Sequence, residues 1–222
     1  MAAFANRITV SLEQSLAHFS KKKATLTGNP VRQTFLKNSS NGGIPAHSDA
    51  ELPTLLVLGG STGAHGLNML VKEASPEITK VCRIEHYTGV REFDESTLPE
   101  RHSTFHFLGE GIAQYLQRAD IVLSRAGMST ISELSELGKP AIIIPMPRTH
   151  QKANAAFLKE KNAAVVLDQE KLTSGTLARI VIELCSSAEH RMTLGKNIST
   201  IMPHNASDAI ARLLIDTAQH HE

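Results

Sequence analysis

Short runs of apolar residues alternate along this chain with longer segments whose apolar residues recur at helical spacing. The short runs are rich in Ile, Val and Leu, and we predict that they form strands. They are Ile8-Ser11, Ala24-Thr27, Thr54-Leu58, Arg83-Thr88, Thr104-Leu108, Asp120-Ser124, Ala141-Pro145 and Ala164-Leu167. Buried strands that alternate with amphipathic helices are typical of a parallel sheet covered on both faces. The pattern therefore predicts an α/β fold with a Rossmann-like parallel sheet.

A stretch without periodicity divides the chain unequally. Residues 37–53 (KNSSNGGIPAHSDAELP) are rich in Ser, Asn, Gly and Pro, which predicts a linker. Residues 1–36 hold a short helix-like end (Met1-Asn6), two strand candidates and one predicted amphipathic helix (Leu12-Phe19), which is too little to enclose a core. We interpret them as the remnant of a domain whose body lies elsewhere. Residues 54–203 carry six strand candidates with their helices, and we expect them to form a complete domain.

Composition excludes several classes of protein. Lys and Arg number 23 against 22 acidic residues, so the net charge of +1 gives no reason to expect nucleic acid as a partner. Cys82 and Cys185 form no CxxC motif, and the 11 histidines lack the spacing of metal ligands, so we expect reduced thiols and no metal site. No apolar run is long enough for a signal peptide or a membrane span. We expect a cytoplasmic protein, and a peripheral contact with the cytoplasmic face of the plasma membrane stays open.

The first motif that carries chemistry is LLVLGGSTGA, residues 55–64. A strand candidate leads into glycines and then into a helix candidate around Leu67-Val71. Glycines allow backbone amides to approach an anion, and the start of a helix favours a phosphate. The alternative is a plain tight turn between strand and helix, because the motif is neither GxGxxG nor a P-loop.

The second motif is ADIVLSRAGMSTISEL, residues 119–134. A strand candidate ends in small residues, and we expect Ser129 or Thr130 to cap a helix whose amides face a ligand diphosphate. Glu133 follows about one turn later, where a carboxylate can accept hydrogen bonds from the vicinal hydroxyls of a ribose. The alternative places Glu133 in a capping box with Thr130.

The third motif is GKPAIIIPMP, residues 138–147, followed by HQKANA, residues 150–155. An apolar strand stops at two prolines, and a polar loop leads to Gln151 and Asn154, which lie one helical turn apart on the same side of the next helix. Their amides can hydrogen-bond the hydroxyls of a sugar. The alternative is a pair of solvated surface amides.

Together these motifs resemble the MurG family of GT-B glycosyltransferases. Six segments occur in the family's order and spacing, and the resemblance covers nearly the whole chain. They are TGNPVR (27–32), GGSTGA (59–64), HYTG (86–89), SRAGMSTISEL (124–134), GKPAIIIPMP (138–147) and HQKANA (150–155). In such relatives the C-terminal Rossmann domain binds UDP-GlcNAc in a cleft that faces the N-terminal domain. The resemblance also implies that residues 204–222 form a helix that crosses back to the N-terminal domain.

The resemblance implies a set of donor-binding residues. In chain order they are Arg32, Ser61, Leu108, Met128, Ser129, Thr130, Ile131, Ser132, Glu133, Gln151 and Asn154. Arg32 and Ser61 resemble contacts of the diphosphate, and Glu133 resembles the ribose ligand. Gln151, with Asn154 beside it, resembles the group that contacts the hydroxyls of GlcNAc.

The remaining donor positions follow from the same motifs. Leu108, after Phe107, is expected to face the uracil. Residues 128–133 resemble the loop and helix start beside the α-phosphate and ribose. UDP-GlcNAc would be a substrate, so no cofactor is expected.

The implied reaction transfers GlcNAc, with inversion, from UDP-GlcNAc to lipid I (undecaprenyl-pyrophosphoryl-MurNAc-pentapeptide) and gives lipid II in peptidoglycan synthesis. Family members begin with a second Rossmann domain that carries a GGTGGH-like motif, a candidate catalytic histidine and the acceptor site, and this sequence shows no such motif. No catalytic residue can therefore be named here, and lipid I is expected to bind only where an N-terminal half is supplied.

Three alternatives stay open beside a MurG-type transferase to which this chain supplies the donor-binding part. The chain is the donor-binding subunit of a two-chain glycosyltransferase, as in the eukaryotic dolichol-linked GlcNAc transferases, whose other half is a separate N-terminal-domain chain. Or it is a fragment that binds UDP-GlcNAc without catalysis. The third is a UDP-GlcNAc epimerase of the GT-B fold.

Overall fold

We describe the fold from a computed structural model, in which residues 4–36, 52–59, 65–89, 93–106 and 111–219 are described. Its centre is a six-stranded parallel sheet with the strand order β5-β4-β3-β6-β7-β8. The strands are β3 (Thr54–Leu58), β4 (Arg83–Tyr87), β5 (His102–Phe105), β6 (Ile121–Ser124), β7 (Ala141–Ile143) and β8 (Val165–Val166). All six overlap the predicted strands, although β5 begins two residues before the predicted Thr104-Leu108, and residues 107 and 108 lie outside the described residues. The predicted α/β fold with a parallel sheet is confirmed.

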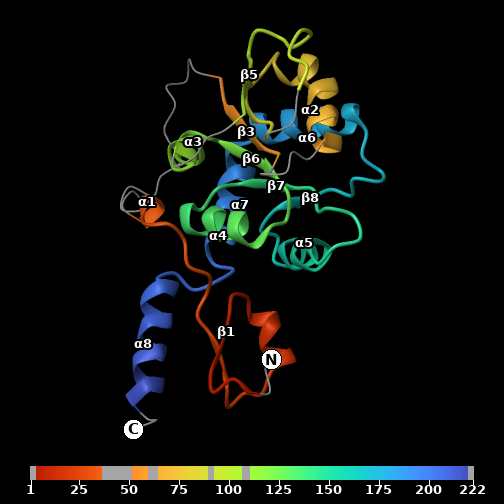
Figure 1. Cartoon of the computed structure of the whole chain (residues 1–222). Coiled ribbons are helices and arrows are strands. Elements are labelled where there is room, and N and C mark those ends of the chain that lie inside the picture. The colour runs from red at the N-terminus through yellow and green to blue at the C-terminus, as the bar shows by residue number, and fades with distance from the viewer. Residues whose placement is uncertain (1–3, 37–51, 60–64, 90–92, 107–110, 220–222) are drawn as a thin grey trace.

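Helices cover both faces of this sheet (Figure 1). They are α2 (His65–Ile78), α3 (Ile112–Arg118), α4 (Met128–Leu137), α5 (Gln151–Glu160), α6 (Ser174–Ser186) and α7 (Ala188–Ser199). Alternate residues of β3 belong to different core clusters: Leu56 packs on the side of α3, α4 and α5, and Leu55 on the side of α2 and α6. Successive side chains of a strand point to opposite faces, so a strand buried on both faces must be apolar throughout. All five residues of β3 are buried accordingly.

The segment before residue 37 forms a small unit of its own. Strands β1 (Ile8–Val10) and β2 (Ala24–Leu26) make a two-stranded parallel sheet. The predicted amphipathic helix at Leu12-Phe19 is wrong in type, because the chain forms a 3-10 helix, η2 (Glu13–His18), that buries none of its residues. No side chain caps η2, and a helix this short cannot be stable without packing.

The end of this segment packs into the sheet domain. Helix α1 (Gln33–Leu36) contacts α4, and the Phe35 side chain is 0% exposed. Phe35 belongs to the same core cluster as Leu56 of β3 and Leu116 of α3. Residues around Phe35 are therefore part of the sheet domain's core, whereas β1 and β2 lie outside it.

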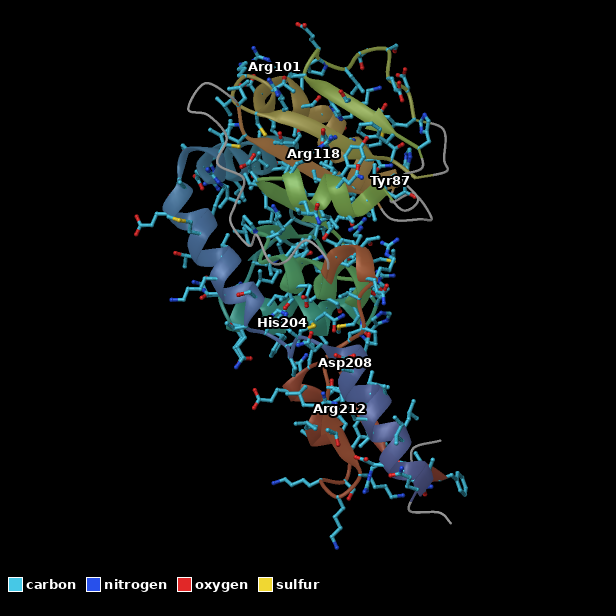
Figure 2. All side chains as sticks on the ribbon, turned by 90° about the vertical axis from the view of Figure 1, so that its left-hand side faces the viewer. Tyr87, Arg101, Arg118, His204, Asp208 and Arg212 are labelled. Carbon is cyan, nitrogen blue, oxygen red and sulfur yellow. The ribbon has the colours of Figure 1, made fainter. Side chains whose placement is uncertain are left out.

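Helix α8 (Ala206–Gln219) extends away from the sheet domain, toward the same end of the molecule as β1 and β2 (Figure 1). Within the described part of α8 only Ala206 is buried, and Leu214 and Ile215 are 66% and 57% exposed. Figure 2 shows His204 where the chain leaves the sheet domain for α8. Among the described residues, no helix is long and apolar enough to cross a membrane.

Gly28 joins the N-terminal segment to the residues before α8. Its φ is +79°, and a Cβ atom at this position would lie 2.4 Å from the carbonyl oxygen of Pro203. We expect Gly28→Ala to lower the free energy of unfolding by about 1–3 kcal/mol, because it adds backbone strain and a clash with main-chain atoms. Urea denaturation followed by circular dichroism measures the change.

Gly175 offers a matched control for this substitution. It lies in the first turn of α6, and a Cβ atom there would meet nothing within 4 Å. Gly175→Ala should leave stability unchanged or raise it by up to about 1 kcal/mol. Equal destabilisation by the two substitutions would show that Gly28 is not held in its conformation by Pro203.

Candidate functional site

The candidate site lies at the carboxyl ends of β3 and β6, in the centre of the sheet. From β3 the chain proceeds through β4 and β5 on one side, and then returns to β6, β7 and β8 on the other. Ligands of open α/β sheets bind in the crevice outside the carboxyl ends of the strands at such a switch point. The loop of residues 125–127 after β6 and the start of α4 lie at this edge of the sheet.

Helix α4 begins directly after that loop, and its first turn lacks a side-chain cap. The N-cap is Gly127, in an extended conformation, and within the described residues no side-chain capping bond is made at this position. The prediction that Ser129 or Thr130 caps the helix is therefore wrong, because both residues lie inside the first turn. The uncapped amides and the helix dipole make this end of α4 suitable for an anionic group.

Glu133 of α4 faces Arg32 of the N-terminal segment. The Glu133 residue is only 8% exposed, and its Oε1 accepts a hydrogen bond of 3.0 Å from Nη2 of Arg32. Burial raises the pKa of Glu133, and the neighbouring guanidinium opposes that shift. The alternative of a capping box with Thr130 is wrong, since Gly127 occupies the N-cap position. The structure thus joins the predicted ribose ligand to a predicted diphosphate contact 101 residues away in the sequence.

Arg32 is held from a second side by an aromatic ring. Its guanidinium carbon lies 5.3 Å from the ring centroid of Phe35, a cation–π geometry. The Arg32 side chain is still 51% exposed, so its remaining donors can reach a ligand. The buried ring and the buried carboxylate together fix a partly exposed positive charge at the start of α4.

Of the other residues of α4 that were predicted to bind the donor, some have exposed side chains and some have buried ones. The Ile131 side chain is fully buried in the core. Ser132 is also buried, and its hydroxyl donates to the carbonyl of Met128 (2.7 Å) and accepts from Nδ2 of Asn29 (3.0 Å). Ile131 and Ser132 therefore shape the site through packing. Ser129 is exposed, and Thr130 is partly exposed, so their side chains are open to a ligand.

Gln151 and Asn154 lie on the first turn of α5, as the sequence predicted. The Asn154 amide donates to the carbonyl of Ala126 at 3.0 Å, which ties α5 to the loop before α4. The Gln151 side chain accepts a hydrogen bond of 3.0 Å from the backbone amide of Met146. Both amides are thus fixed by protein partners beside the crevice and are not freely solvated, and each keeps further hydrogen-bonding capacity.

Arg125 belongs to the site and was not among the predicted residues. Its Nη1 donates to the carbonyl of Ile144 (3.1 Å) and to Oε1 of Gln169 (2.5 Å). Burial lowers the pKa of Arg125. The guanidinium thereby holds together the ends of β6 and β7 and the turn after β8. A cation directly after a fully apolar strand is the sequence signal that could have identified it.

Two predicted residues cannot be placed. Ser61 and Leu108 lie outside the described residues, so their roles stay predictions. Within the described ranges, no group of three or more His, Cys, Asp or Glu side chains is arranged to hold a metal ion.

Comparison with known proteins identifies the class. The C-terminal domain of glycosyltransferase family 28 matches residues 54–212. A crystal structure of MurG from Acinetobacter baumannii superposes with a TM-score of 0.76, at 21% identity, over 97% of this chain and 61% of that one. A crystal structure of CalG4, the calicheamicin glycosyltransferase, gives a TM-score of 0.63 at 18% identity, over 95% of this chain and 53% of that one. The fold is therefore that of the GT-B glycosyltransferases.

Sequence relatives narrow this class further. A UDP-N-acetylglucosamine--N-acetylmuramyl-(pentapeptide) pyrophosphoryl-undecaprenol N-acetylglucosamine transferase from Synechococcus sp. (strain RCC307) is 33% identical over 97% of this chain and 62% of its own length. A protein of the same name from Geobacter sulfurreducens is 30% identical over 100% of this chain and 64% of its own length. The chain belongs to glycosyltransferase family 28, and its similarity is to the MurG branch, as the motifs predicted. It spans less than two thirds of the length of these relatives.

Proposed function

We propose that this chain is the donor-binding part of a glycosyltransferase that transfers GlcNAc from UDP-GlcNAc to lipid I and forms lipid II. The contact between Arg32 and Glu133 carries the proposal, because it joins the residue predicted to contact the diphosphate to the residue predicted to contact the ribose, beside the first two turns of α4. A donor would displace part of this contact, with the ribose on the carboxylate and the diphosphate beside the guanidinium. The family match favours glycosyl transfer over the epimerase alternative.

The chemistry proposed for this chain is stabilisation of the leaving group. Negative charge grows on UDP as the bond to the sugar breaks. Arg32 and the uncapped amides at the start of α4 would offset that charge, in a site whose dipoles are already oriented. The mechanism needs no metal ion to assist the departure of UDP.

The acceptor and the general base are proposed to come from an N-terminal half, either on the same polypeptide or on a separate chain. Two surfaces support such a half. Helix α8 exposes Leu214 and Ile215, and Phe4 is 93% exposed near β1. Strands β1 and β2 form a two-stranded parallel sheet, a type that normally occurs inside a larger α/β layer. Since lipid I is a membrane lipid, the assembled enzyme would work at the cytoplasmic face of the plasma membrane.

Titration calorimetry with UDP-GlcNAc tests the donor site. We expect Glu133→Gln to weaken binding by about tenfold or more, because a hydrogen bond to a charged acceptor contributes roughly 1.5–3 kcal/mol. Glu136→Gln is the matched control, since Glu136 lies one turn further along α4 and pairs with His204 instead (2.8 Å). The control should stay within about twofold of the wild type.

Two outcomes would contradict the proposal. One is a wild-type chain that binds neither UDP nor UDP-GlcNAc. The other is equal loss of affinity in both variants, which would show that Glu133 acts only through stability. Transfer of GlcNAc to a lipid I analogue, measured with and without an added N-terminal half, then separates a transferase from a fragment that only binds the donor.

A further inference from the structure

A buried chain of polar side chains lies beneath the ends of β3 and β4, and none of its members has a part in the donor contacts described above. It consists of Asn68 on α2, His86 on β4 and His102 on β5, which are 3%, 0% and 6% exposed. His86 Nε2 lies 3.1 Å from Oδ1 of Asn68, and His86 Nδ1 lies 3.1 Å from Nε2 of His102. Three elements on one side of the switch point are thus joined by side chains.

The positions of the imidazole protons follow from the hydrogen bonds among Asn68, His86 and His102. Nδ2 of Asn68 donates to the carbonyl of Thr88 at 2.9 Å, so Oδ1 of Asn68 faces His86 and can only accept. His86 must therefore carry its proton on Nε2. Its Nδ1 then accepts from the Nε2 proton of His102. Burial keeps both imidazoles neutral, with the pKa lowered to about 3 for His86 and about 4 for His102.

The Asn68 carboxamide occupies the space beside Gly59, where the glycine-rich motif begins. A Cβ atom at Gly59 would lie 2.6 Å from Oδ1 of Asn68 and 2.8 Å from the carbonyl oxygen of Tyr87. The Gly59 amide also donates to that carbonyl at 2.8 Å. Asn68 therefore requires a glycine at the end of β3, and it fixes this residue against Tyr87 and Thr88 at the end of β4.

We propose that Asn68 and His86 are positioning residues for the donor site: they hold Gly59, at the carboxyl end of β3, against the end of β4, on the edge of the sheet where a nucleoside diphosphate sugar is proposed to bind. This inference rests on the proposed function. An amide suits the task because it satisfies His86 and Thr88 at once and carries no charge. A carboxylate at position 68 would lose the hydrogen bond to Thr88, attract a proton onto His86, and place negative charge near the diphosphate.

Charged and titratable groups surround His86 from several elements and bear on any pH test. They are His102 of β5, Lys72 of α2 with its ion-pair partner Asp94 (2.8 Å), and Glu95, which raises the pKa of His102. Phe93 packs edge-on against His86, with 5.3 Å between the ring centroids, and separates it from Lys72. The Asn68 site itself holds no charge in the wild type.

The decisive variant is Asn68→Asp. We expect it to bind UDP-GlcNAc about tenfold more weakly at pH 7 in titration calorimetry. We also expect its affinity to vary between pH 5.5 and 8 more steeply than that of the wild type, because His86 gains a carboxylate partner and titrates in this range. Nitrogen-15 NMR of the imidazoles should show His86 as the Nε2–H tautomer in the wild type and as a doubly protonated ring in Asn68→Asp at the acid end.

Asn197→Asp is the matched control. Asn197 on α7 makes the same kind of bond, from Nδ2 to the carbonyl of Asn162 at 2.9 Å, and it lies outside the donor site. It should keep the affinity and the pH profile of the wild type. If Asn68→Asp does not fold, a second pair replaces it: His86→Gln retains a donor toward Asn68 and should bind within about threefold of the wild type, whereas His86→Leu should lose about tenfold.

The outcomes separate this inference from the proposed function. A wild-type chain that fails to bind UDP-GlcNAc overturns the proposed function and this role with it. Wild-type binding together with unchanged affinity and pH profile in Asn68→Asp overturns the positioning role alone. So does a wild-type His86 found as the Nδ1–H tautomer, a measurement that needs no ligand. Equal losses of UDP-GlcNAc affinity in His86→Gln and His86→Leu also contradict it, because the affinity would then depend only on how the side chain at position 86 packs.

Discussion

Replacing Phe35 with alanine should lower the free energy of unfolding by about 3–5 kcal/mol, the range for a fully buried aromatic side chain. Phe35 is 0% exposed and packs in the core cluster that holds residues of β3, α3 and α4. Its loss would leave a cavity where the N-terminal segment meets the sheet domain. Because natural domains are stable by about 5–15 kcal/mol, the variant should unfold at much lower urea concentration.

Phe4→Ala is the matched control for this effect, because Phe4 is 93% exposed. It should change stability by no more than about 0.5 kcal/mol. The two variants together measure whether the residues just before position 37 belong to the sheet domain. A small effect of Phe35→Ala would mean that α1 does not pack on this core in solution. The substitution should also weaken donor binding, since the Arg32 guanidinium would lose the ring beneath it.

Lowering the pH from 7.5 to 5 should reduce the free energy of unfolding by about 4 kcal/mol through the two buried histidines, about 2 kcal/mol from each. In the folded chain the pKa is about 3 for His86 and about 4 for His102, below the ordinary value of 6.5. The unfolded state therefore binds protons first as the pH falls. The stability that these groups contribute is complete above pH 6.5 and is lost progressively as the pH falls toward 4 and 3.

His204 has a small and opposite effect on the pH dependence of the free energy of unfolding. Its hydrogen bond to Glu136 raises its pKa, so it stabilises the folded state below pH 6.5 and loses this effect as the pH rises. The His204 side chain is 44% exposed, and solvent screening keeps this contribution small. The buried histidines therefore determine the sign of the acid effect.

Urea denaturation at several pH values between 5 and 8 measures this dependence. His102→Gln is the informative variant, because an amide can still donate to Nδ1 of His86 but cannot titrate. The acid loss should fall to about 2 kcal/mol in this variant. An unchanged slope would show that His102 does not carry the effect.

The sheet could be predicted from the sequence because its strands are buried on both faces. Leu55–Leu58 and Ile121–Leu123 are continuous apolar runs, and such runs between helical segments have few other interpretations. The N-terminal helix was less accessible to prediction. Its six residues contain few apolar side chains and bury none of them fully, so the local pattern did not determine its form.

The sequence indicated which residues of the candidate site to consider together, but it did not indicate their contacts. Motifs placed Arg32 and Glu133 in one site, whereas their direct pairing depends on how the N-terminal segment packs on α4. The N-cap of α4 was predicted wrongly. Serine and threonine are in general stronger N-cap residues than glycine, but the N-cap residue of α4 is Gly127. Arg125 and Asn68 escaped prediction because their partners come from distant elements.

The hydrogen bonds from Asn29 and Arg32 to Ser132 and Glu133 place the end of the N-terminal segment directly on α4, the helix of the proposed donor site. A ligand that competes with Arg32 for Glu133 must change the free energy with which this segment docks. Thermodynamic reciprocity then requires that whatever alters the docking of the segment alters the affinity for the ligand by the same factor. If a nucleotide binds at the proposed site, its occupancy and the docking of the N-terminal segment on α4 form a single coupled equilibrium.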